Sequence, residues 1–208
     1  MAQINVYVMR HGQKESGGNS DLARLTKNGR LQVMSSAANN IKHIGFDALY
    51  ASCKFRTLET VVSAVSVLPN RNNKLSINTD IGFDYTGAPG LDQFKQASEE
   101  VSLLALGKPV TVAMWMAVAP EMIGFLRERF TRTLLATAHY HHAGAIGRKE
   151  TKGMLNILVA SHSPVGELAC LDPETTPMLR EADIMRYTID VLPRETKIVE
   201  VQYIPRGF

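Results

Sequence analysis

The sequence has few cysteines, little net charge and no long apolar run. Its two cysteines, Cys53 and Cys170, form neither a C-x-x-C pair nor the cysteine framework of a disulfide-rich secreted domain. The 23 Lys and Arg residues nearly balance the 20 Asp and Glu residues, so the net charge of +3 gives no reason to expect a nucleic-acid or membrane partner.

No stretch of the sequence approaches the roughly 18 apolar residues of a membrane-spanning helix. The first residues also lack the basic and apolar regions of a signal peptide. We therefore expect a soluble protein of the cytoplasm, and the sequence leaves its oligomeric state open.

The chain does contain a regular alternation of predicted strands and helices. Its 208 residues, 45% of them hydrophobic, suffice for one sizeable core, and we expect a single domain over residues 1–208. Hydrophobic periodicity predicts strands at 4–9, 46–51, 75–78 and 154–160, and a final hairpin of 187–192 and 197–204. It predicts helices at 26–41, 55–68, 91–106, from 120 onward and at 167–170, and a loop at 143–153. This order predicts a three-layer α/β sandwich with a mostly parallel central sheet flanked by helices, to which the hairpin adds antiparallel edge strands.

Polar residues follow the ends of three predicted strands. Arg10 and His11 follow the first strand, Arg56 lies at the start of the helix after the second, and His162 follows the strand of 154–160. The carboxyl ends of parallel strands lie at one edge of a sheet, where open α/β proteins bind their ligands. Two guanidinium groups and helix N-termini at that edge would bind a tetrahedral oxyanion such as a phosphoryl group.

These residue types favour phosphoryl transfer through a histidine. An imidazole among fixed cations takes up a proton less readily, which leaves a ring nitrogen free to act as a nucleophile. Attack by His11 on a phosphoryl group would form a phosphohistidine. The two arginines and His162 would stabilise the charge on the equatorial oxygens in the transition state.

The leaving oxygen also needs a proton, and two aspartates are candidates to donate it. Asp80 ends the third predicted strand and is the first candidate, and Asp84 is the alternative. An aspartate at a strand end is also typical of turns and caps, just as Ser52 after the second strand is typical of a helix N-cap. We expect residues 82–90, rich in glycine, to form a loop over the site.

Several segments together resemble the histidine phosphatase superfamily, the phosphoglycerate-mutase-like group. In family order they are RHG at 10–12, LTKNGRLQ at 25–32, YASCKFRTLET at 50–60, an acidic residue ending the third strand, and VASHS at 159–163. The resemblance implies a three-layer α/β fold with His11 as the phosphorylated nucleophile. It also implies that Arg10, Arg56 and His162 bind the phosphate, and that Asp80 stands where many members carry a glutamate as proton donor.

The chain departs from the family pattern at two of these positions. Asp80 is one methylene shorter than glutamate, and His162 is followed by Ser163-Pro164 rather than by glycine. We predict a metal-independent phosphomonoester hydrolase that needs no cofactor and acts on a small phosphorylated substrate. A phosphoglycerate-type mutase and a non-catalytic phospho-ligand-binding protein of the same fold are the alternatives.

Two further patterns have a simpler structural interpretation. Of His139, His141 and His142, only the first and last share a helix face, and no cysteine or carboxylate joins them. We therefore expect a solvated helix end there rather than a metal site. The Met-Trp-Met run at 114–116 is typical of core or of a pocket wall.

Overall fold

The computed structural model describes residues 2–16, 21–69, 75–147 and 154–207. A six-stranded sheet with the order β3-β2-β4-β1-β5-β6 lies at its centre. Strands β3, β2, β4 and β1 are parallel to one another. Strand β5 pairs antiparallel with β1, and β6 pairs antiparallel with β5 to form the C-terminal hairpin. The strands are β1 (Ala2–Arg10), β2 (Ala48–Ala51), β3 (Ile77–Thr79), β4 (Met154–Ser161), β5 (Ile184–Val191) and β6 (Thr196–Ile204).

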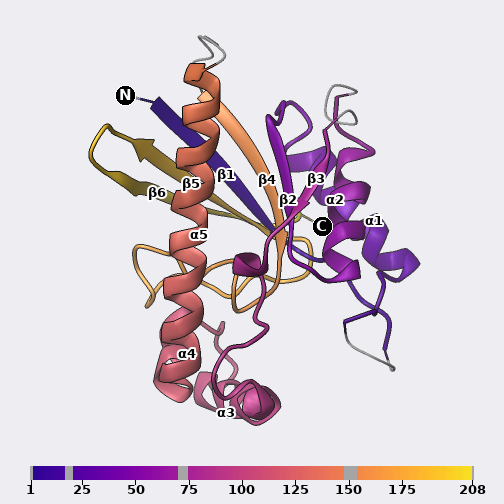
Figure 1. Cartoon of the computed structure of the whole chain (residues 1–208). Coiled ribbons are helices and arrows are strands. Elements are labelled where there is room, and N and C mark those ends of the chain that lie inside the picture. The colour runs from indigo at the N-terminus through magenta and orange to yellow at the C-terminus, as the bar shows by residue number, and fades with distance from the viewer. Residues whose placement is uncertain (1, 17–20, 70–74, 148–153, 208) are drawn as a thin grey trace.

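Helices cover both faces of the sheet. Helices α1 and α2 lie on one face and α5 on the other, while α3 and α4 lie beyond the end of the sheet (Figure 1). This arrangement confirms the predicted three-layer sandwich with a mostly parallel sheet. The helices are α1 (Lys27–Asn40), α2 (Phe55–Val65), α3 (Phe94–Ala105), α4 (Val112–Val118) and α5 (Pro120–Gly147), with short 3-10 turns at Ile81–Phe83 and Leu91–Gln93. In the described part of the chain, no helix is long and apolar enough to cross a membrane.

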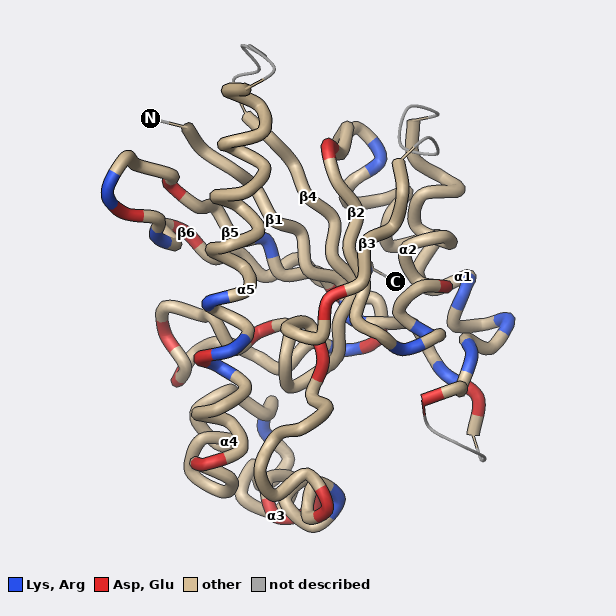
Figure 2. The backbone as a smooth tube through the Cα atoms, viewed as in Figure 1, with Lys and Arg blue, Asp and Glu red and all other residues tan. Residues whose placement is uncertain are grey.

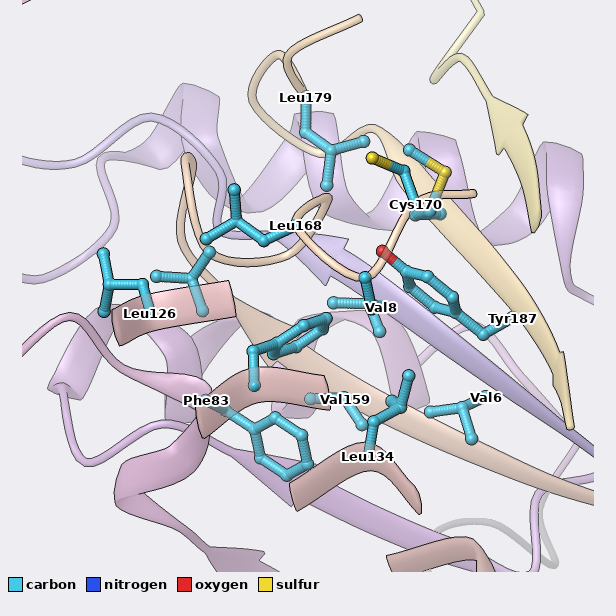
Figure 3. Packing of buried hydrophobic residues seen from close by; sticks show 14 of the residues in the cluster. Val6, Val8, Phe83, Leu126, Leu134, Val159, Leu168, Cys170, Leu179 and Tyr187 are labelled. Atoms are coloured by element: carbon cyan, nitrogen blue, oxygen red, sulfur yellow. The ribbon is translucent and has the colours of Figure 1, made fainter. Parts of the chain in front are cut away.

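The two faces of the sheet bury two separate hydrophobic clusters. Side chains alternate along a strand, so Val6 and Val8 of β1 pack on the α5 side, while Tyr7 and Met9 pack on the side of α1 and α2. Figure 3 shows the first cluster, which contains these two valines and Leu134 of α5. Burial on both faces explains why β1 and β4 are nearly continuous apolar runs.

The register of the parallel strands aligns their carboxyl ends. Arg10 of β1 lies beside Ser161 of β4, and Ala51 of β2 lies beside both Ala160 of β4 and Thr79 of β3. The next residue of each strand therefore leaves the sheet at the same edge. Figure 2 shows that the parallel strands carry little charge along their length and that charged residues gather in the loops at this edge.

Two local predictions are wrong, and one helix was missed. Residues 143–147 were expected in a loop but continue α5, where the alanines of this segment favour helix and Ala145 is buried. Residues 167–169 lie in hydrogen-bonded turns rather than in a helix, because the amides of Leu168 and Cys170 bond to carbonyls only three residues earlier, those of Val165 and Glu167. Helix α4 was not predicted, since a short apolar run fits a strand or a helix equally well. Residues 148–153 of the expected loop lie outside the described residues.

Candidate active site

His11 follows β1 and is 7% exposed. Its Nδ1 donates a hydrogen bond to the carbonyl of Gly12 at 2.8 Å, which leaves the lone pair of a neutral ring on Nε2. Burial, together with the charges of Arg10, Arg56 and Lys14, lowers the pKa of His11 to about 3, although the bond to Gly12 acts in the opposite direction. The imidazole is therefore neutral at neutral pH and has the form that a nucleophile requires.

Two glycines in direct backbone contact hold the loop that carries His11. A Cβ atom on Gly12 would lie 2.3 Å from the carbonyl oxygen of Gly29, and one on Gly29 would lie 2.1 Å from the carbonyl oxygen of Gln13. No side chain fits at either position. Thr26 is the N-cap of α1, as predicted, and its side chain accepts a hydrogen bond from the amide of Gly29. Glycine is unfavourable within a helix, but at position 29 it allows the first turn of α1 to lie against the loop of His11.

His162 follows β4 and lies edge-on to His11, with ring centroids 5.2 Å apart. It is 1% exposed, and its Nε2 donates to Ser52 Oγ at 2.7 Å while its Nδ1 faces Nη2 of Arg56 at 3.4 Å. Burial, followed by the nearby His11, Arg56 and Lys54, holds the pKa of His162 well below its ordinary value. Ser52 was expected to cap α2, but Lys54 occupies the cap position and the Ser52 hydroxyl orients His162 instead.

The two arginines lie in different surroundings. Arg56 in the first turn of α2 is 2% exposed, and its Nη2 donates to the hydroxyl of Tyr85 at 2.6 Å. Arg10 at the end of β1 donates through Nη1 to the carbonyl of Leu179 at 2.5 Å. Together with His11 and His162, both arginines line one cavity of about 540 Å³. The structure thus brings together the four residues that the sequence predicts for a phosphate pocket.

Several solved structures share this architecture. The chain is similar to a phosphoserine phosphatase from Entamoeba histolytica in complex with 3-phosphoglyceric acid, with 16% identity, 98% of each chain covered and a TM-score of 0.56. It is similar to the alpha-ribazole phosphatase from Shigella flexneri, with 16% identity, 98% of this chain and 96% of that chain covered, and a TM-score of 0.55. A third match is the protein histidine phosphatase SixA complexed with tungstate, with 17% identity, 96% of each chain covered and a TM-score of 0.50.

The chain has the histidine phosphatase fold. No family model and no curated protein matches its sequence. At such low identity the likeness concerns the fold, and the roles of individual residues depend on the geometry of this chain.

Within this histidine phosphatase fold, the cavity holds a third cation that the sequence analysis did not single out. Lys54 is 6% exposed, and its Nζ donates to Asp21 Oδ1 at 2.8 Å and to Thr86 Oγ1 at 2.9 Å. The signal for it was present, because Lys54 lies two residues before Arg56 at the start of α2. A lysine beside two arginines adds to the positive potential that would attract a phosphoryl group.

The two candidate proton donors lie in different places. The carboxylate of Asp80 accepts the backbone amide of Gly82 at 2.7 Å and caps the 3-10 turn, and Asp80 does not line the cavity. Asp84 is fully buried, with its Oδ2 3.8 Å from His162 Nε2 and 3.9 Å from Lys54 Nζ. Asp84 therefore lies where it would balance a positive charge on His162.

A buried carboxyl group, Glu167, bonds to Ser163, which lines the cavity. Its Oε1 accepts the Ser163 hydroxyl at 2.5 Å and the Leu179 amide at 3.2 Å, so it joins the segment after β4 to the segment that anchors Arg10. Burial raises the pKa of Glu167 to about 7, although the bond from Ser163 and the charge of Arg10 lower it. No local pattern indicates a role for Glu167, because its burial depends on the turns that follow His162.

The histidine cluster on α5 is separate from this cavity. His139 is exposed, and His141 bonds through Nε2 to the hydroxyl of Tyr50 at 2.9 Å. Among the described residues, no group of three or more His, Cys, Asp and Glu side chains is placed to hold a metal ion. The two cysteines are free thiols.

Proposed function

We propose that this protein is a phosphomonoester hydrolase that forms a phosphohistidine on His11 and works without a metal ion or cofactor. The observation that carries the proposal is a neutral, buried His11, with Nδ1 bound to a carbonyl, in a cavity lined by Arg10, Arg56, Lys54 and a second neutral histidine. A fixed lone pair next to several cations suits attack on a phosphorus atom that carries negative oxygens.

In the first step, Nε2 of His11 attacks the phosphorus atom and the bond to the leaving oxygen breaks. Arg10, Arg56 and Lys54 bind the phosphoryl oxygens throughout, and His162 contributes a hydrogen bond when it carries a proton. The leaving oxygen takes a proton from an acid, for which Asp80 is the first candidate and Asp84 the alternative.

In the second step, water attacks the phosphohistidine and the phosphorus–nitrogen bond breaks. The proton of the attacking water returns to the acid, phosphate leaves and His11 is again neutral. The names of the similar solved proteins, which include a phosphoserine phosphatase and an alpha-ribazole phosphatase, support a phosphate monoester as the substrate class.

Steady-state phosphate release from a panel of phosphorylated sugars, glycerates, nucleotides and phosphopeptides, with and without chelator, tests this proposal. We expect turnover that the chelator does not change, a phosphorylated enzyme in rapid-quench mass spectra, and loss of both in His11→Ala with the fold retained. Transfer of the phosphoryl group between positions of a glycerate would indicate the mutase. Tight phosphate binding without turnover, or a His11→Ala variant as active as the parent, would contradict the proposed hydrolase.

A further inference from the structure

One wall of the cavity is aromatic and begins at the phosphate pocket. Tyr85 accepts a hydrogen bond from Arg56 through its hydroxyl, and its ring lies 4.9 Å from the ring of His162. Phe94, the first residue of α3, stacks on Tyr85 with centroids 6.2 Å apart and 23° between the planes. Tyr85, Leu91 and Phe94 line the cavity and are only partly buried, so part of each side chain faces open space.

The wall is held rigidly from behind. Trp115 of α4 is 6% exposed and stacks on Phe94, with centroids 5.2 Å apart and 26° between the planes. The three rings of Tyr85, Phe94 and Trp115 thus form a stacked row that starts at Arg56. A preformed apolar surface next to a charged pocket binds a ligand with little loss of conformational freedom.

The lining of the cavity disfavours a leaving group that carries a negative charge. Asp21 and Glu181 both line it, and in the proposed function Arg10, Arg56 and Lys54 already bind the phosphoryl group. The remaining lining cation, among the described residues, is the exposed Lys14, whose charge is weakened by water. A carboxylate on the leaving group would therefore meet two like charges and little compensating positive charge.

Resting on the proposed function, we infer that this protein acts on phosphomonoesters whose leaving group carries an uncharged aromatic ring next to the phosphoryl group. The phosphoryl group occupies the pocket of Arg10, Arg56 and His11, and the ring packs against Tyr85, Leu91 and Phe94. A cavity of about 540 Å³ has room for both parts. Aromatic rings gain from offset or edge contacts with other rings in addition to the area they bury.

The inference can be tested by binding, without turnover. Isothermal titration of the full chain with benzylphosphonate and with ethylphosphonate compares a ring with a short alkyl group on the same anion. We expect the benzyl compound to bind about tenfold more tightly, and Phe94→Ala to reduce this ratio to about threefold or less. The matched control is Leu103→Ala on the same helix, where the side chain is 73% exposed and the ratio should stay unchanged. Phe94→Leu serves as a second variant if Phe94→Ala does not fold.

Turnover of benzyl phosphate and ethyl phosphate, whose leaving alkoxides are similarly basic, should show the same ratio in kcat/KM. Equal affinities for the two phosphonates, an unchanged ratio in Phe94→Ala, or a higher kcat/KM for 3-phosphoglycerate than for benzyl phosphate would overturn the inference. Preferential binding of benzylphosphonate without turnover of either ester would support ring recognition and contradict the proposed hydrolase.

Discussion

The phosphate pocket and the aromatic wall are two parts of one cavity, but they are built differently. The pocket uses His11, Arg56 and His162, which are 7%, 2% and 1% exposed and project from the ends of buried strands or from the first turn of a helix packed on them. The wall uses Tyr85 and Phe94 from the loop and helix beyond the sheet, and both are partly exposed. On the proposed function, the sheet would position the reacting groups, whereas the peripheral segment would set the choice of leaving group. Changes in the pocket should therefore affect all substrates alike, and changes in the wall should alter discrimination.

The largest effect is expected from Arg56→Ala in the pocket. Loss of a buried guanidinium should lower kcat/KM on the order of 10²–10³-fold, because transition-state charge loses a fixed donor. The loss should be equal for benzyl and ethyl phosphate, as measured by steady-state kinetics. Arg56→Lys keeps the charge but not the planar guanidinium, so its kcat/KM should lie between that of the parent and that of Arg56→Ala. A loss confined to benzyl phosphate would remove the distinction between pocket and wall.

Glu167, which bonds to Ser163 in the cavity lining, should give a pH-dependent stability cost that the wall lacks. The pKa of Glu167 is raised from 4.5 to about 7 in the folded state, so the folded protein binds the proton more tightly than the unfolded chain. The contribution of Glu167 to the free energy of unfolding is therefore complete below pH 4.5. As the pH rises to about 7, that free energy falls by about 3 kcal/mol.

Glu167→Gln removes this titration. In urea unfolding, the free energy of unfolding of the variant should rise relative to that of the parent between pH 4.5 and 7. The difference should stay constant above pH 7. Phe94→Ala is the control from the wall, and its difference from the parent should not vary with pH. A Glu167→Gln difference that is equally flat would contradict the raised pKa.

The third prediction concerns the proton donor. Asp80→Asn should slow ethyl phosphate about 100-fold and para-nitrophenyl phosphate only a few-fold, because an activated aryl leaving group needs little protonation. The readout is the ratio of kcat values for the two esters. Equal effects on both would move the acid role away from Asp80, and Asp84→Asn would be the next variant to measure.

The smallest effect is expected where the two regions meet. Tyr85→Phe keeps the ring but removes the hydroxyl that accepts Nη2 of Arg56. Losing one hydrogen bond to a buried charged group should lower kcat/KM about fivefold for both benzyl and ethyl phosphate. The benzyl preference should persist, in contrast to Phe94→Ala. A change in that preference would show that the hydroxyl itself contacts the leaving group.

Much of the pocket was predictable because its signals are local. An apolar run that stops at Arg10, and a second that stops at His162, identify strand ends, and parallel strands bring their ends together. The six-stranded sheet and its C-terminal hairpin follow from the same periodicity. Thr26 was recognised as a cap because that role depends only on the residues next to it.

Other residues of the cavity depend on contacts between distant segments. Ser52 looks like a cap in sequence, yet its hydroxyl bonds to His162, 110 residues later. Glu167 is buried only because the turns after β4 fold against the segment of Leu179. Leu31 and Phe55 follow helical spacing but are 54% and 44% exposed, since periodicity does not show where a helix face leaves the sheet.

The contact between Gly12 and Gly29 ties the reactive nitrogen to the docking of one helix. Because the loop of His11 rests on the backbone of α1, a transient detachment of that helix would release the nucleophile while the strands stay paired. Catalytic competence would then vanish on heating before the sheet melts. Turnover would accordingly be lost at a lower temperature than the circular dichroism signal of the folded sheet.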